Sequence, residues 1–214
     1  MTEKDRWAPE CRGTGPVLSE AGATVTNVIN DDLRHYLQQS RDGMLRALDG
    51  LSEFDVRRPV TPTGTNLLGL VKHLAGVEGG YLVECVGRPL PVSFPWNDDG
   101  SVWESADMWA TPDQSQDYLV GLYREVWVHS DASIAELPLD APALVEWWPA
   151  ERQHTTFGHL LARVVDETAR HAGHADIVRE TIDGQAGRDR DAVGNAEWWA
   201  AYVARIQAAA DTFR

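Results

Sequence analysis

Cysteine is scarce in this chain, because Cys11 and Cys85 are the only two among its 214 residues. Two cysteines do not make a disulfide framework, and this usage suits a reducing cytoplasm. They do not form a Cys-x-x-Cys pair, which argues against a cysteine-based metal or redox site. Neither has the local signature of a catalytic nucleophile. The sequence therefore predicts a cytoplasmic protein that does not depend on cysteine ligands.

Long apolar runs and positive charge are also lacking. No apolar run approaches the ~18 residues that a membrane span needs, and the N-terminus has no apolar core of the signal-peptide type. Lys and Arg number 19 against 33 Asp and Glu, which gives a formal net charge of −14. This balance argues against nucleic acids and anionic membrane surfaces as partners, since both require clustered Lys and Arg. We expect small-molecule partners instead.

Several well-known catalytic motifs are absent. The sequence contains no Gly-x-Ser-x-Gly nucleophile elbow. It has no Gly-x-x-x-x-Gly-Lys phosphate loop and no dinucleotide fingerprint after a strand. His129, His154 and His159 show no recognisable spacing to a partner residue. The chemistry must therefore be sought elsewhere in the chain.

Helical periodicity dominates the sequence. The hydrophobic content of 43% is enough for a full core, and apolar residues recur at helical spacing in five segments with few strand signals between them. The predicted helices cover residues 31–51, 65–85, 111–137, 155–182 and 195–213. We therefore expect an all-α fold, namely a four-helix bundle with an additional C-terminal helix. The order could be up-down-down-up or up-down-up-down.

Helix boundaries follow from capping residues. Asp31 and Asp32 are expected at the start of the first helix, where carboxylates bind free N–H groups. Thr111 and Pro112 give a cap followed by proline for the third helix. Thr65 or Asn66 is expected to start the second helix and Thr155 or Thr156 the fourth, which Asp183 and Gly184 should end.

Two further segments stand out by composition. Residues 1–28 are polar and rich in Gly and Pro, so they are expected to form an extended or partly disordered arm before a helical domain at 29–214. The tryptophan-rich segment 94–109 is expected to form a packed, structured connection. The whole connection over 87–110 is long for a structureless loop, and such loops are often functional.

One helical face in the stretch 166–176 carries three potential metal ligands. Glu167, His171 and His174 lie within roughly 60° of one another at about 100° per residue. Ionisable groups are costly to bury unless they are paired or coordinated, and a bound metal ion offsets that cost. His73 on the second helix offers a further ligand from a facing helix, as metal sites in bundles often require.

Each of these residues also has a purely structural interpretation. Glu167 could pair with Arg163 or with a protonated His171 along the helix, and His174 could lie at the surface. His73 alone would most simply be a core histidine.

Two aromatic residues are candidates for substrate binding. Tyr81 lies on the second helix, and Trp148 could line a pocket if its connection folds over the site. The alternative is that the tryptophan pairs at 147–148 and 198–199 only pack in the core or between helices.

The two ligand-bearing segments carry a resemblance to a known family. Residues 67–75 and 167–180 together resemble the DinB-like superfamily of four-helix-bundle metalloproteins. The closer likeness is to an actinobacterial branch that includes the mycothiol-dependent maleylpyruvate isomerase N-terminal domain and mycothiol S-transferases. The segment 181–184 and the helix with Trp198 and Trp199 fit that branch too, so the likeness covers roughly residues 30–210.

The resemblance implies a metal site. In this superfamily a His on the second helix and two residues four apart on the last bundle helix bind a divalent ion, often Zn²⁺, with Ni²⁺, Fe²⁺ and Mn²⁺ as alternatives. Many members have His at both of the last positions, whereas the isomerase has Glu then His. Carried over, the metal ligands are His73, Glu167 and His171. His174 becomes a neighbour on the same face, with three candidate roles: a catalytic proton acceptor, a group that orients a ligand, or a pocket residue.

The resemblance also implies a function. Related proteins are transferases that activate a low-molecular-weight thiol, here mycothiol as co-substrate, as a metal-bound thiolate for attack on an electrophilic small molecule. Such a reaction would serve detoxification or natural-product biosynthesis. The alternatives are a metal-dependent isomerase or hydrolase that needs no thiol, and a non-catalytic protein that binds metal or a ligand, for instance as a dimer.

Overall fold

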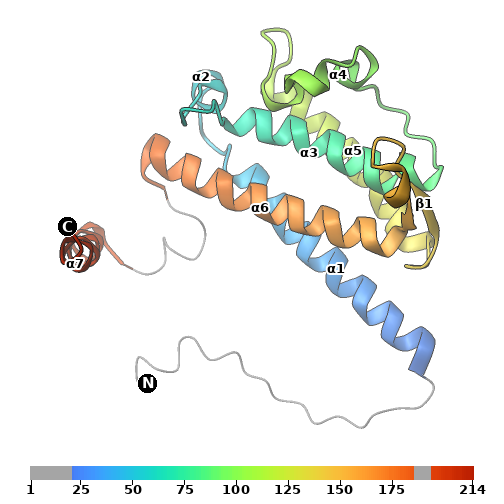
Figure 1. Cartoon of the computed structure of the whole chain (residues 1–214). Coiled ribbons are helices and arrows are strands. Elements are labelled where there is room, and N and C mark those ends of the chain that lie inside the picture. The colour runs from blue at the N-terminus through green and yellow to red at the C-terminus, as the bar shows by residue number, and fades with distance from the viewer. Residues whose placement is uncertain (1–20, 186–193) are drawn as a thin grey trace.

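The computed structural model describes residues 21–185 and 194–214, with side chains from residue 28 onward. Four long helices lie side by side (Figure 1), and the expected all-α four-helix bundle is confirmed. They are α1 (Ala21–Arg46), α3 (Leu67–Leu82), α5 (Gln116–Glu136) and α6 (Phe157–Asp183).

Hydrogen bonds between distant residues give the directions of three helices. Arg179 near the end of α6 donates to the carbonyl of Ala47 just after α1, at 3.0 Å, so α1 and α6 run parallel. Asn30 in α1 donates to the carbonyl of Ile134 near the end of α5, at 2.8 Å. Helix α5 therefore runs antiparallel to both.

Core packing gives the direction of α3. Leu67 at its start shares an apolar cluster with Leu48 just past the end of α1, whereas Leu82 at its end shares a second cluster with Leu37. Helix α3 is therefore antiparallel to α1 and parallel to α5. The order is up-down-down-up, which decides between the two arrangements that the sequence allowed.

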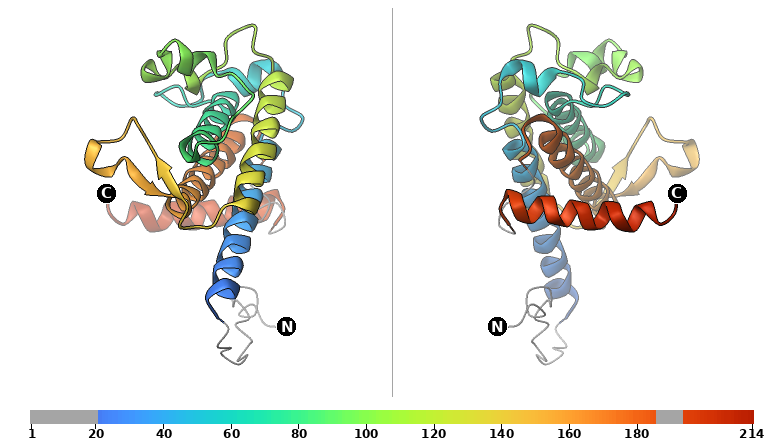
Figure 2. Two further views of the ribbon diagram at one scale, coloured as in Figure 1. Left: turned by 90° about the vertical axis from the view of Figure 1, so that its right-hand side faces the viewer. Right: turned by 90° about the vertical axis from the view of Figure 1, so that its left-hand side faces the viewer.

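A parallel pair of consecutive helices requires a connection that returns along their length. The chain between α3 and α5 makes this return through η2 (Glu84–Val86), α4 (Pro95–Asp98), η3 (Ser101–Glu104) and η4 (Ala106–Met108). Figure 2 shows this connection above one end of the bundle. Phe94 and Trp96 are buried against the core. The expectation of a structured connection is therefore confirmed.

Two shorter connections complete the bundle. The first, between α1 and α3, contains the short helix α2 (Glu53–Arg57). The second, between α5 and α6, contains η5 (Ala150–Arg152) and an antiparallel hairpin of β1 (Pro142–Leu144) and β2 (His154–Thr156).

Most of the expected caps are present. The side chain of Asn66 accepts from the Gly69 N–H at 2.7 Å at the start of α3. Thr156 caps α6, and Gly184 ends it with a φ of 79°. The sequence therefore located both ends of the helix that carries the ligand motif.

The predicted start of the first helix was wrong. Helix α1 begins at Ala21, so Asp31 and Asp32 lie exposed inside it and cap nothing. Two exposed carboxylates can lie at the start of a helix or inside it, so the pattern alone did not locate the start of α1. Residues 21–28 of the expected arm are helical, while 1–20 lie outside the described residues.

The predicted start of the third bundle helix was also wrong. Helix α5 begins at Gln116, capped by the side chain of Ser115. Arg57 explains the delay, because its guanidinium binds the carbonyls of Thr111 at 3.0 Å and Gln114 at 2.5 Å and holds that segment as a turn.

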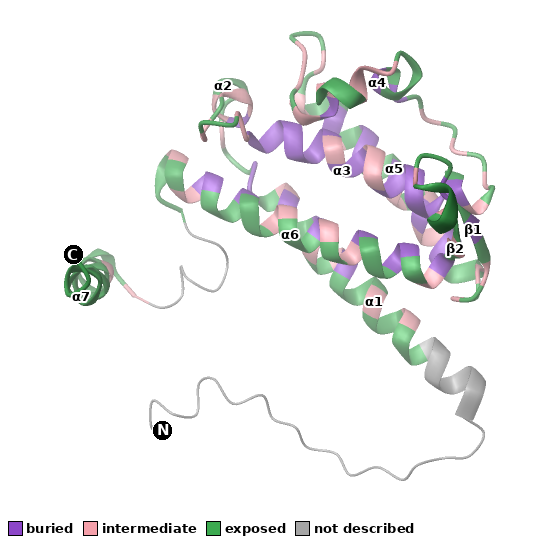
Figure 3. Cartoon of the chain, in the orientation of Figure 1, coloured by how far each residue is buried: buried purple, intermediate pink, exposed green. Residues whose placement is uncertain are grey.

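The additional C-terminal helix is confirmed as α7 (Ala196–Asp211), which begins after the cap Asn195. None of its residues is buried (Figure 3). Its aromatic side chains contact one another, with Trp198 stacked on Tyr202 at a centroid distance of 5.1 Å. None of the helices among the described residues combines the length and apolar content needed to cross a membrane.

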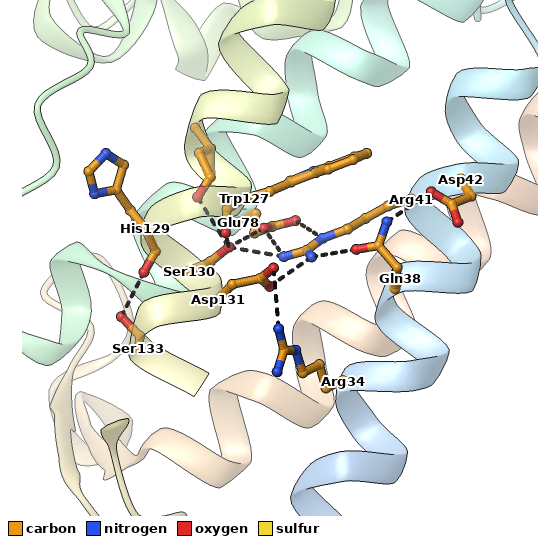
Figure 4. A network of polar contacts seen from close by, with 11 residues as sticks. Arg34, Gln38, Arg41, Asp42, Glu78, Trp127, His129, Ser130, Asp131 and Ser133 are labelled. Carbon is orange, nitrogen blue, oxygen red and sulfur yellow. Dashed lines mark hydrogen bonds and ion pairs between the residues drawn. The ribbon is translucent and has the colours of Figure 1, made fainter. Parts of the chain in front are cut away.

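A buried polar layer lies between the two apolar clusters along α1, α3 and α5, and Figure 4 shows the contacts within it. Arg41 of α1 and Glu78 of α3 are fully buried and form a salt bridge at 2.5 Å. Ser130 of α5 donates to Glu78 and Asp131 accepts from Arg41 at 2.9 Å. Every charge in this layer therefore has partners from the chain itself.

Candidate metal centre

His73, Glu167 and His171 meet where α3 and α6 cross. Each offers one ligand atom, and the three atoms lie within 4.8 Å of one another. The Oε1 atom of Glu167 lies 3.3 Å from Nε2 of His171 and 3.5 Å from Nε2 of His73. The antiparallel pairing of α3 and α6 thus brings His73 to the residue pair that the sequence placed one helical turn apart.

The local packing leaves this cluster half-open. On α6, Val164 and Thr168 are fully buried, whereas Glu167 and His171 are only partly covered. The side chains of His73, Glu167 and His171 are 19%, 25% and 12% exposed. A small molecule can therefore approach a group held by these residues.

The two histidines have opposite pKa shifts. Burial lowers the pKa of His73, but the hydrogen bond and charge of Asp107, together with Glu167, raise it above the ordinary value. Burial lowers the pKa of His171, and the positive charge of His73 lowers it further. His171 is therefore neutral at pH 7, which is the form that binds a metal ion.

Sequence reasoning missed Asp107, which lies in η4. Its Oδ2 atom is 2.6 Å from Nδ1 of His73, and the residue is buried. The only signal for it was the length of the connection over 87–110, which did not single out one carboxylate among several.

His174 lies next to the cluster without joining it. Its Nδ1 is 3.3 Å from Nδ1 of His171, and the residue is exposed. It therefore contacts the ring of His171 on the side away from Glu167.

Tyr81 lies about two helical turns after His73 on α3, and Trp148 contacts it there. The Tyr81 hydroxyl accepts from Nε1 of Trp148 at 3.2 Å and of Trp147 at 3.4 Å. The Arg163 guanidinium lies over the Tyr81 ring at 5.1 Å and the Trp148 ring at 5.6 Å. Arg163 forms no salt bridge among the described residues, so the alternative of an Arg163–Glu167 pair was wrong.

Cys85 offers no nucleophile. It is buried, and burial, followed by the charges of Glu84 and Glu146, raises the pKa of its thiol to about 12. A thiol with this pKa stays protonated at neutral pH and reacts slowly. Thiol chemistry at this site would therefore need a thiol from outside the described chain.

The family comparison agrees with the geometry. Residues 32–184 match the model of the family described as Mycothiol-S-transferase. The match covers well over half of the chain and includes both ligand-bearing helices, whereas α7 lies outside it. No curated protein matches the chain. The chain belongs to the mycothiol S-transferase family of DinB-like helical bundles.

Proposed function

We propose that this protein is a metal-dependent S-transferase that joins mycothiol to an electrophilic small molecule. The observation that carries the proposal is the cluster of His73, Glu167 and His171 in a chain that belongs to a mycothiol S-transferase family. The proposed setting is the cytoplasm, in detoxification or natural-product biosynthesis, and a homodimer stays a prediction.

The three residues fit a divalent ion chemically. Two imidazole nitrogens and one carboxylate oxygen are a donor set that suits Zn²⁺ and also Ni²⁺, Fe²⁺ and Mn²⁺. Glu167 faces two imidazoles and forms no salt bridge with Lys or Arg among the described residues. When bound, a divalent ion would supply the positive charge that lowers the pKa of a thiol to near neutrality.

Three protein ligands favour a catalytic over a structural site. Structural zinc sites are usually closed by four protein ligands, whereas catalytic ones keep a position open. The one further candidate ligand was His174, and it lies beyond His171, outside the cluster of three. This arrangement supports an enzyme rather than a non-catalytic binding protein.

The remaining candidate residues have complementary roles. His174 is exposed beside His171 and would accept the proton of the thiol. The sulfur would then form a bond to an electrophilic carbon, and the electron pair would leave on a group such as halide. Tyr81 and Trp148 would bind the sugar part of mycothiol, together with Arg163, whose guanidinium lies over both rings.

The experiment is a mycothiol consumption assay with a panel of alkylating electrophiles. We expect turnover by the zinc-loaded protein, no turnover after chelation, and none for His171→Ala. His35→Ala, an exposed histidine of α1, is the matched control and should behave as wild type. Turnover that survives chelation, or turnover that needs no thiol, would contradict the proposal.

A further inference from the structure

The two ring nitrogens of His73 have different partners. Nε2 faces Glu167 at 3.5 Å, while Nδ1 lies 2.6 Å from the Asp107 carboxylate. A carboxylate at one imidazole nitrogen holds the proton there and leaves the lone pair on the other nitrogen. The contact with Asp107 therefore selects the tautomer in which Nε2 can bind a cation.

We infer that Asp107 is a positioning residue that fixes the tautomer and the ring orientation of His73 for metal binding. This inference rests on the proposed function, because it assumes that His73, Glu167 and His171 hold a divalent ion. The connection between α3 and α5 then has a role in the site, because it brings Asp107 to the Nδ1 atom of His73.

The position of Asp107 is itself fixed by Lys72, the residue before His73. Lys72 is buried, and its Nζ donates to the carbonyls of Ala106 at 2.6 Å and Trp109 at 3.0 Å. These carbonyls flank Asp107 along the chain. One ammonium group therefore holds the backbone on both sides of the carboxylate.

Gly69 and the cap residue Asn66, about one and two helical turns before Lys72, contact the same segment. The Asn66 side chain donates to the carbonyl of Met108 at 3.0 Å. A Cβ atom at Gly69 would overlap that same carbonyl oxygen, so only glycine allows η4 to approach this closely. Asn66, Gly69 and Lys72 are three apart, which places them along one side of a helix.

The result is a rigid support for a metal ligand. Groups that orient a ligand from behind must be held as firmly as the ligand itself. The carbonyls of Ala106, Met108 and Trp109 are all bound by α3, so the Asp107 carboxylate has little freedom to leave His73.

The test measures Zn²⁺ affinity by competition with a chromophoric chelator. For Asp107→Ala we expect affinity about 10–100-fold weaker than wild type, the usual effect of removing a carboxylate behind a His ligand. The matched control is Glu104→Ala, which removes an exposed carboxylate from the same connection and should leave affinity unchanged.

A spectroscopic readout separates positioning from general stability. In the Co²⁺-loaded protein, Asp107→Ala should shift the visible absorption bands, which report ligand geometry, while Glu104→Ala should not. Asp107→Asn can still accept a hydrogen bond from Nδ1–H, so it should keep most of the wild-type spectrum and affinity. Loss of the wild-type spectrum and affinity in a folded Asp107→Asn variant would contradict the positioning role, so this variant remains a test if Asp107→Ala fails to fold.

The outcomes separate the positioning role of Asp107 from the existence of the metal site. If wild type binds Zn²⁺ and both Asp107 variants bind it equally tightly with unshifted Co²⁺ bands, the positioning role is wrong and the proposed metal site stands. If wild type binds neither ion, the proposed metal site fails and this inference fails with it.

Discussion

Two polar clusters on α3 lie five residues apart and differ in how their charges are satisfied. Glu78 is fully buried, and its partner Arg41 is buried with it. His73 is partly exposed, and it faces the carboxylates of Glu167 and Asp107. Both clusters join α3 to neighbouring elements, yet among the described residues only the first contains salt bridges from an arginine or lysine.

The difference teaches how to tell a structural polar layer from a binding site. In the first cluster the chain itself supplies the cation, because Arg41 lies between Glu78 and Asp131. In the second, neither Glu167 nor Asp107 forms a salt bridge with Lys or Arg among the described residues. Carboxylates that converge on histidines alone, in a half-open position, are what a divalent ion requires.

The largest expected effect is a loss of stability when the buried polar layer of Arg41 and Glu78 is disrupted. Glu78→Ala would leave the Arg41 guanidinium buried without its main partner, so the free energy of unfolding should fall by about 3–5 kcal/mol. Urea denaturation measures this loss. The double replacement Arg41→Met with Glu78→Leu should cost much less, and an equal loss in the double variant would contradict the account.

The cluster of His73, Glu167 and His171 should instead make the stability of the protein depend on zinc. At free Zn²⁺ about 100 times its dissociation constant, the wild-type free energy of unfolding should rise by about 2.7 kcal/mol. His171→Ala should lose this gain while its metal-free stability stays within about 1 kcal/mol of wild type. Thermal unfolding with and without zinc tests both parts, and a zinc gain retained by His171→Ala would contradict the assignment.

A smaller effect is expected at the aromatic residues beside the cluster. Tyr81→Phe removes the hydroxyl that is proposed to bind a mycothiol sugar, and one hydrogen bond is worth about 0.5–1.5 kcal/mol. The KM for mycothiol should therefore rise roughly 3–10-fold. The KM for N-acetylcysteine, which lacks the sugars, should not change. Equal effects on both thiols would argue against sugar binding at Tyr81.

The smallest effect concerns Cys85. With a pKa of about 12, its thiolate fraction at pH 8 is only about one part in 10⁴. Because the raised pKa keeps the thiol protonated, alkylation of native Cys11→Ser protein should be slow at pH 8 and accelerate only at strongly alkaline pH or on unfolding. Mass spectrometry after timed iodoacetamide treatment measures this, and rapid alkylation of the native protein would contradict it.

The sequence predicted those parts of the site that depend on local spacing. Glu167 and His171 share a helical face because they are four residues apart, and His73 lies on the apolar helix that packs against them. The start of α3 followed from Asn66 and the end of α6 from Gly184, whose capping chemistry is specific.

The parts that depend on tertiary structure escaped prediction. Periodicity does not give the order of helices in a bundle, and the parallel pairing of α3 with α5 is what returns the connection over His73. Asp107 is 34 residues from His73 in the chain, so no local pattern joins them. The start of α5 failed for a related reason, since a cap residue is favoured locally but Arg57 decides the conformation at Thr111.

The most direct test of the central claim is the metal content of untagged protein by mass spectrometry, for wild type, His171→Ala and His35→Ala. We predict about one zinc or similar ion per chain in wild type and His35→Ala, and almost none in His171→Ala. Absence of metal from wild type even after reconstitution, or equal metal in His171→Ala, would contradict the account.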